Sequence, residues 1–147
     1  MNYFIIFLMG ALLIYLSYID LREKRIPNMI IGPAYIASTF YNLYLFFNSR
    51  ENIVYSNFLG FLFAIGLMLL IGIISKGGIG GGDIKLYGLL GLTFGFQTVL
   101  KIIVFSTIWG GFFSILLVLL KKKKLKDSLP FAPFIMLGFL TAVFTRL

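Results

Sequence analysis

Residues 53–74 read IVYSNFLGFLFAIGLMLLIGII, and residues 77–85 that follow them read GGIGGGDIK. The first stretch is long and apolar enough to cross a bilayer as a helix. The second stretch has five glycines within six residues, from Gly77 to Gly82, and this excludes a stable helix there. Asp83 then begins another apolar stretch, and it is one of five acidic residues in the chain. A carboxylate at a membrane edge is costly, so Asp83 is a candidate for function.

The composition of the whole chain indicates a membrane protein. Its 147 residues are 60% hydrophobic and 12% charged, whereas soluble domains are about 45–50% apolar and about 25% charged. A chain of this length usually forms one domain. We therefore predict an all-α, polytopic membrane helix bundle, with a single domain over residues 1–147.

Six apolar segments indicate about six transmembrane helices, at residues 2–19, 29–47, 53–74, 84–96, 102–120 and 131–147. The fourth segment covers roughly 20 Å, less than the ~30 Å hydrocarbon core. With both termini outside, ten basic residues lie inside and three outside, in agreement with the positive-inside rule. The inner ones are Arg22, Lys24, Arg25, Lys76, Lys85, Lys121, Lys122, Lys123, Lys124 and Lys126, and the outer ones are Arg50, Lys101 and Arg146. Merging segments four and five into one helix would place the lysine run outside, against the positive-inside rule. A hairpin turn is therefore predicted near residues 95–101.

The chain has neither cysteine nor histidine. Disulfides, thiolate metal sites, cysteine nucleophiles and the Ser-His triad are therefore excluded, and we predict no metal and no cofactor. The net charge of +8 comes from basic residues in short loops beside apolar segments. That placement favours membrane lipids as partners, with no nucleic acid.

Two aspartates are expected on the same side of the membrane. Asp20 ends the first segment and Asp83 begins the fourth, so they lie at similar depth and meet if these helices pack together. Two close carboxylates share a proton, which lets one act as base on a water molecule and the other as acid toward a peptide bond. We place the shared proton mainly on Asp20, because a helix C-terminus disfavours an anion and the N-terminus at Asp83 favours one.

Simpler interpretations of both aspartates stay open at this point. Asp20 also fits a solvated loop with surface ion pairs. The glycines before Asp83 fit either a flexible loop with Asp83 as helix N-cap, or an exposed backbone that pairs with an extended substrate.

Three motifs, in this order, resemble the type IV prepilin peptidase family, which includes the archaeal preflagellin peptidases. Asp20 followed by Ile26-Pro27-Asn28 is similar to the family's first aspartate and its Ile-Pro-Asn. Gly80-Gly81-Gly82-Asp83-Ile84-Lys85 is similar to its Gly-x-Gly-Asp-x-Lys signature, and Pro130-Phe131-Ala132-Pro133-Phe134 to its Pro-Phe-x-Pro-Phe element. The resemblance implies that Asp20 and Asp83 are catalytic. It also implies that a second set shapes the site or binds substrate: Gly80, Gly82, Lys85, Pro27 and Asn28.

The resemblance further implies a membrane aspartic endopeptidase of the cytoplasmic membrane, with its active site facing the cytoplasm. Such enzymes remove the leader peptide from type IV pilin-like precursors, which carry a basic leader and a hydrophobic stem. Many bacterial members also methylate the new N-terminus and carry an additional cytoplasmic segment with paired cysteines. This chain has no cysteine, which puts N-methyltransferase activity in doubt.

Two alternatives come from other classes of protein. A small ion-coupled transporter would use the broken glycine-rich segment and an aspartate to bind an ion. Against it, both aspartates are expected near one face, and no inverted repeat is visible in the sequence. A non-catalytic pilus assembly protein would tolerate the loss of either carboxylate.

Overall fold

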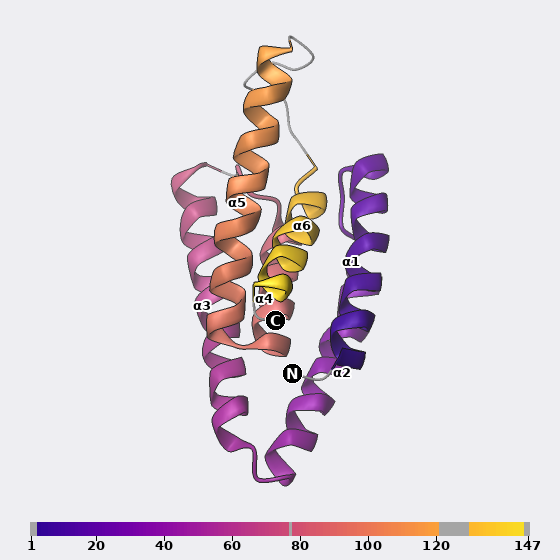
Figure 1. The fold of residues 1–147 in the computed structure, drawn as a ribbon, viewed down its shortest axis with the longest axis vertical. Helices are drawn as coiled ribbons and strands as arrows, with labels where there is room; N and C mark the ends of the chain where they lie inside the picture. The colour runs from indigo at the N-terminus through magenta and orange to yellow at the C-terminus, as the bar shows by residue number, and fades with distance from the viewer. Residues whose placement is uncertain (1–2, 77, 121–129, 146–147) are drawn as a thin grey trace. The chain divides into compact units, whose positions relative to one another are not determined.

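A computed structural model describes residues 3–76, 78–120 and 130–145. Within these ranges the chain forms six helices and no strand (Figure 1). The helices are α1 (Tyr3–Glu23), α2 (Asn28–Phe47), α3 (Glu51–Ile74), α4 (Gly81–Phe94), α5 (Phe96–Leu119) and α6 (Ala132–Phe144). The all-α prediction is confirmed. Gly77, the basic residues of 121–126 and Arg146, which entered the predictions, lie outside the described residues.

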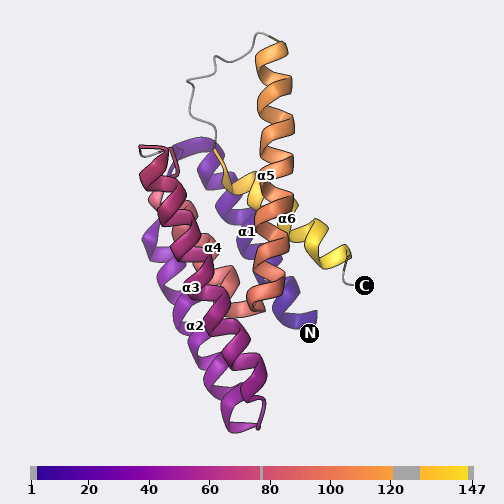
Figure 2. The same ribbon diagram turned by 90° about the vertical axis from the view of Figure 1, so that its left-hand side faces the viewer.

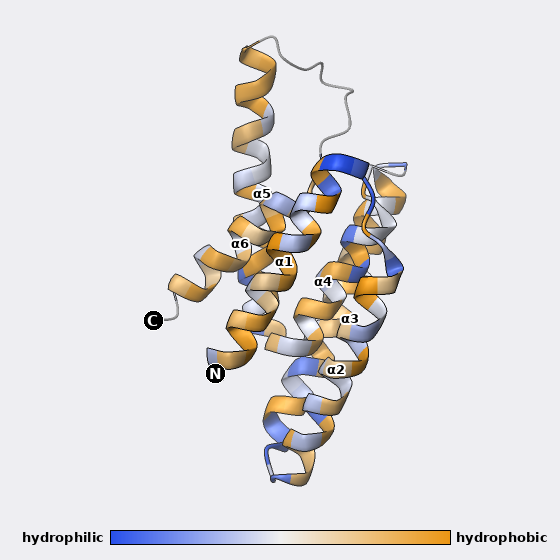
Figure 3. Ribbon diagram, turned by 90° about the vertical axis from the view of Figure 1, so that its right-hand side faces the viewer, coloured by the Kyte–Doolittle hydropathy of each residue, from blue (hydrophilic) through white to orange (hydrophobic). Residues whose placement is uncertain are grey.

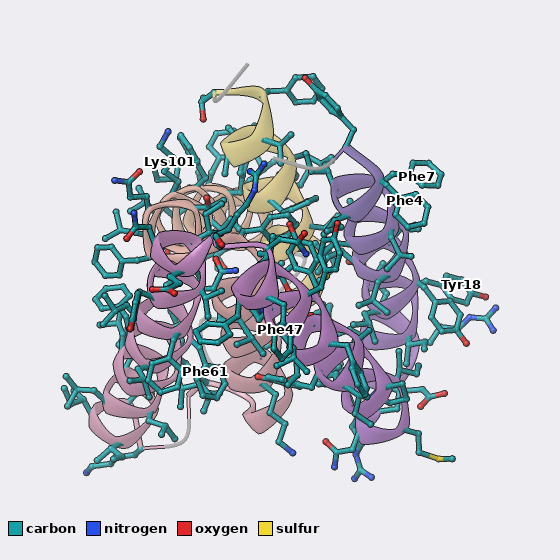
Figure 4. The ribbon with its side chains drawn as sticks, turned by 90° about the horizontal axis from the view of Figure 1, so that it is seen from below. Phe4, Phe7, Tyr18, Phe47, Phe61 and Lys101 are labelled. Carbon is teal, nitrogen blue, oxygen red and sulfur yellow. The ribbon has the colours of Figure 1, made fainter. Side chains whose placement is uncertain are left out.

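Four of these helices, α1, α2, α3 and α5, are long and apolar enough to cross a membrane, and α6 is a shorter apolar helix. Many residues along the helices are hydrophobic, and hydrophilic residues gather near the end of α1 (Figure 3). Phe4, Phe7 and Tyr18 point outward from α1 (Figure 4) and are 69%, 77% and 51% exposed. Large exposed apolar side chains of this kind suit contact with lipid, so the chain is a multi-pass membrane protein. The orientation of its termini stays a prediction.

The chain divides into two compact units. The first contains α1, α6 and most of α5, and the second contains α2, α3, α4 and the first residues of α5. The divisions fall between Arg25 and Ile26 and between Leu100 and Lys101. That residues 1–147 act as one domain stays a prediction.

In the second unit, α4 packs against α2 and α3 (Figure 2). At the contact with α3, a Cβ on Gly91 would overlap the backbone of Gly60, so the two helices approach through glycines. The α4 side chains Leu86, Leu89 and Leu90 are fully buried. With 14 residues α4 is about 21 Å long, shorter than the hydrocarbon core, and its burial in protein makes that length tolerable.

Buried polar side chains also join the three helices of the second unit. The hydroxyls of Ser38 and Thr93 lie 2.9 Å apart. The Asn42 amide donates to the backbone oxygens of Ser38 and Leu92, at 2.9 Å each, and the Asn57 amide donates to Asn42 Oδ1 at 2.8 Å. These bonds give the buried groups partners that water cannot supply in a membrane. They therefore hold α4 in register with α2 and α3.

In the first unit, α1 and α6 run antiparallel, since the end of α1 contacts the start of α6 and Gly10 contacts Phe139. The buried residues of α1 recur at the spacing of one helix face and are Met9, Leu13, Leu16, Ser17 and Asp20. We call this face the α1 stripe. On the other side of α6, a Cβ on Gly138 would lie 2.7 Å from the Ile102 carbonyl oxygen, so α5 and α6 pack closely.

The predicted turn between the fourth and fifth segments is shorter than expected. Only Gly95 interrupts the helices, with φ of +82°, and Lys101 (labelled in Figure 4) lies within α5 rather than in a loop. A side chain at Gly95 would be strained by this φ, and its Cβ would lie 2.7 Å from Ser56 Oγ. A single glycine therefore makes the break for which the hydropathy pattern had suggested several residues.

Candidate active site

Asp20 lies on the α1 stripe, in the last turn of the helix, and is 5% exposed. Its Oδ2 accepts a hydrogen bond from the backbone N–H of Ala132, the first residue of α6, at 3.0 Å. The first N–H groups of a helix have no partner within it, and Phe131, the N-cap of α6, supplies no side-chain bond. Asp20 thus caps α6 from another helix. This geometry rules out the solvated-loop interpretation of Asp20.

The same contact changes the electrostatic setting that the sequence suggested for Asp20. The predicted preference of the shared proton for Asp20 rested on a contrast between two helix ends, the C-terminus of α1 at Asp20 and the N-terminus of α4 at Asp83. Asp20 also faces the N-terminus of α6, where the partial positive charge favours an anion. The two helix ends at Asp20 act in opposite directions, so helix polarity distinguishes Asp20 from Asp83 less than the sequence suggested.

The start of α6 is fixed by the Pro-Phe-Ala-Pro-Phe element. Pro133 is the second residue of α6, where a missing N–H costs little. The rings of Phe131 and Phe134 lie 5.7 Å apart, and a Cβ on Gly110 would lie 2.8 Å from the Phe131 ring. The element is therefore a helix start, and it brings the Ala132 N–H to Asp20.

The helix α4 begins at Gly81, so Gly81 and Gly82 are helical although the glycine run had predicted no helix there. Asp83 is the third residue of α4, and the N-cap is Gly80 rather than Asp83 itself. The Asp83 N–H donates to the Gly80 carbonyl at 3.0 Å. A Cβ on Gly80 would lie 3.2 Å from Asp83 Oδ2, so the carboxylate reaches back over the start of the helix. The helix dipole favours an anion there. Asp83 is therefore in the first turn, as predicted, but it is not the N-cap.

The three glycines before Asp83 differ in what surrounds them. A Cβ on Gly82 would lie 2.8 Å from the Ile26 Cβ, closer than packed side chains allow, whereas one on Gly81 would meet nothing within 4 Å. Gly80 leaves room for the Asp83 carboxylate. Close contacts thus explain why the two fixed positions of the Gly-x-Gly-Asp signature are glycines. No such contact requires a glycine at the position between them.

The Ile-Pro-Asn motif meets the glycine motif directly. Pro27 is the N-cap of α2, Asn28 is its first residue, and Lys85 Nζ donates to Asn28 Oδ1 at 2.8 Å. The Tyr35 hydroxyl donates to the Lys85 carbonyl oxygen at 2.7 Å. All five predicted site-shaping residues therefore lie around the start of α4 in the second unit, and Asp20 lies in the first unit with Ala132.

Two of these contact residues carried no usable signal in the sequence, because Tyr35 is an ordinary residue of an apolar segment and Ala132 contributes only a backbone N–H. Ile26 belongs to the Ile-Pro-Asn motif, but it was not selected as a site residue. Among the residues that the structure describes, no group of three or more histidine, cysteine or acidic side chains gathers that could hold a metal ion. The chemistry that the described site offers is that of carboxylates anchored at helix ends.

The chain is similar to known proteins over most of its length. A model of the type IV leader peptidase family matches residues 7–115, which include both aspartates. A prepilin leader peptidase/N-methyltransferase of Aeromonas hydrophila is 29% identical over 129 residues, 87% of this chain and 44% of the relative. One of Bacillus subtilis is 28% identical over 138 residues, 90% of this chain and 52% of the relative. The chain thus spans about half the length of these relatives. No solved structure gives a significant match.

Proposed function

The chain belongs to the type IV leader peptidase family, and on that premise we propose that it is a membrane aspartic endopeptidase that removes leader peptides from pilin-like precursors. The observation that carries the proposal is the anchoring of Asp20. Its carboxylate is 5% exposed and is held by a backbone N–H of another helix. An ionisable group inside a membrane protein is a functional candidate, and the family's second aspartate corresponds to Asp83.

In the proposed reaction Asp20 and Asp83 act as a pair that shares one proton. The ionised carboxylate takes a proton from water, and the water oxygen bonds to the scissile carbonyl carbon. The other carboxyl group gives its proton to the carbonyl oxygen at the same time. When the tetrahedral intermediate collapses, the C–N bond breaks, the amine takes the proton held by the first carboxyl, and the second carboxyl recovers its own.

The substrate we propose has a basic leader and a hydrophobic stem. The stem stays in the membrane beside the apolar helix surfaces, and the leader is cut at the cytoplasmic face of the cytoplasmic membrane. A basic leader is not attracted by a basic inner surface, so recognition rests on the stem, on anionic lipid, or on the backbone near Gly81. The space around Gly81 suits an extended peptide that pairs with the backbone.

The proposal covers peptide cleavage and does not extend to methylation. The relatives' names combine both activities, but this chain spans about half of their length. It also lacks the paired cysteines expected of members that methylate. Methyltransferase activity therefore stays in doubt, and an assay for it would follow the cleavage test.

The test is cleavage of pilin-like precursors from the same genome, co-expressed with wild type, Asp20→Asn or Asp83→Asn and followed by gel shift. We expect each variant to lose about a thousandfold in rate, the usual scale for a group that transfers protons. Glu23→Gln is the matched control, because Glu23 is an exposed carboxylate three residues after Asp20.

Each alternative function has its own outcome in this experiment. Cleavage that persists in either aspartate variant, with normal membrane insertion, contradicts the dyad. An assembly protein would support filament formation in both variants without any cleavage. A transporter would move an ion in wild-type vesicles and lose that flux in Asp83→Asn.

A further inference from the structure

The α1 stripe contains a hydroxyl group whose role the proposed reaction does not explain. Ser17 is 5% exposed, and its Oγ has no hydrogen-bond partner within the described part of the chain. Buried polar groups nearly always have a partner, and a serine within a helix commonly bonds to the carbonyl one turn before it. The Ser17 hydroxyl forms no such bond within the described residues. It is therefore available to a ligand that enters the site.

Ser17 and Asp20 are neighbours on one helix face. They are three residues apart on the α1 stripe, a spacing that places their Cβ atoms about 5–6 Å apart. Both are buried to the same degree, and the other members of the stripe are apolar. A hydroxyl and a carboxylate one turn apart make a small polar spot that suits a water molecule, which needs two to four polar partners.

We propose that Ser17 binds the water molecule that attacks the scissile bond. The water donates one O–H to the Asp20 carboxylate and the other to Ser17 Oγ, which leaves an oxygen lone pair free to bond to the carbonyl carbon. This inference rests on the proposed function, because it assigns a role in that same reaction. Positioning of this kind acts in the transition state more than on substrate binding, so it affects kcat rather than KM.

The experiment compares steady-state cleavage by wild type, Ser17→Ala, Ser17→Thr and Thr98→Val. Thr98 is the matched control, since its Oγ1 is also buried without a partner but belongs to α5 in the second unit. We expect Ser17→Ala to lose about tenfold in kcat, the scale of one good hydrogen bond, with KM within twofold. Ser17→Thr keeps the hydroxyl and should recover to within about threefold, and Thr98→Val should match wild type.

Thermal unfolding gives a second readout that does not depend on cleavage. If the Ser17 hydroxyl had no ligand, its removal would delete a buried unsatisfied group and raise Tm by about 2–4 °C. If it binds water, Ser17→Ala should leave Tm unchanged or lower it. A wild-type kcat in Ser17→Ala, a clear rise in its Tm, or equal losses in the alanine and threonine variants each overturn the proposal. A wild type that cuts no precursor contradicts the proposed function itself, whereas these results leave that function intact.

Discussion

The two proposed catalytic aspartates lie in different local surroundings. Asp20 lies on the packed face of a long apolar helix, and a backbone N–H from the first residue of α6 fixes its carboxylate. Asp83 lies at the start of a short helix, next to Gly80 and Gly82, where a side chain would crowd Asp83 or Ile26. A group of another helix contacts the Asp20 carboxylate, and glycines leave room beside Asp83 at the start of α4.

This difference decides which substitutions each region tolerates. Around Asp83 the risk is added volume, since a single methyl group at Gly82 would overlap the Ile26 side chain. Around Asp20 the risk is a lost acceptor, since a buried N–H would be left without a partner. Variants that add volume or remove an acceptor therefore probe the two regions separately.

The largest effect on stability is expected from Gly82→Ala. Its Cβ would lie 2.8 Å from the Ile26 Cβ, and relief of that overlap must move the start of α4 and Asp83 with it. Overpacking of this kind costs up to about 3 kcal/mol, more than the roughly 1 kcal/mol that alanine gains over glycine within a helix. We expect cleavage to fall at least about a hundredfold, since small displacements of catalytic groups have effects of this size. Thermal unfolding and the gel-shift assay measure the two effects.

Gly81→Ala is the matched control for this prediction. Its Cβ would meet nothing within 4 Å, so stability should stay equal or rise by up to about 1 kcal/mol. Ile26→Ala should not rescue Gly82→Ala, because the closest atom is the Ile26 Cβ, which alanine keeps. Equal behaviour of Gly81→Ala and Gly82→Ala would show that the glycines act through flexibility rather than space.

The sequence predicted most of the fold, for a physical reason. Hydrophobic segments long enough for a bilayer are visible without any partner, and four of them are confirmed as candidate spans. The extent of the fourth-to-fifth turn was wrong, because Gly95 alone breaks the helices through a backbone angle that hydropathy does not report. Apart from Asp20, the residues of the α1 stripe were not predicted, since an apolar helix with lipid around it shows little amphipathic contrast.

The site was predictable in part. The surroundings of Asp83 could be predicted from the sequence, and those of Asp20 could not. Glycines near Asp83 are visible in the sequence, so Gly80, Gly82 and Lys85 could be selected from it, and the structure places them at the start of α4. The bond between Asp20 and the Ala132 N–H was invisible, because any residue except proline supplies a backbone N–H. Catalysis by Asp20 and Asp83 stays a prediction that rests on the resemblance and on the family.

An intermediate effect should separate the structural role of Asp20 from its proposed chemical one. Asp20→Asn keeps a side-chain oxygen that can accept the Ala132 N–H, whereas Asp20→Ala leaves that buried N–H without a partner. We expect Asp20→Ala to be less stable than Asp20→Asn by about 2 kcal/mol, while both lose cleavage. Equal stability of the two variants would mean that the bond to α6 contributes nothing to folding.

The smallest effect is expected where the two motifs of the second unit meet, at the bond between Lys85 Nζ and Asn28 Oδ1. Both residues are exposed, so water replaces the lost partner and the coupling should be about 0.5–1 kcal/mol. A double-mutant cycle of Lys85→Met and Asn28→Ala, measured on cleavage, should show that the second substitution costs less once the first is made. Asn28→Asp keeps an acceptor for Lys85 and serves as the control. Strict additivity would mean that the bond between Lys85 and Asn28 does not position the start of α4.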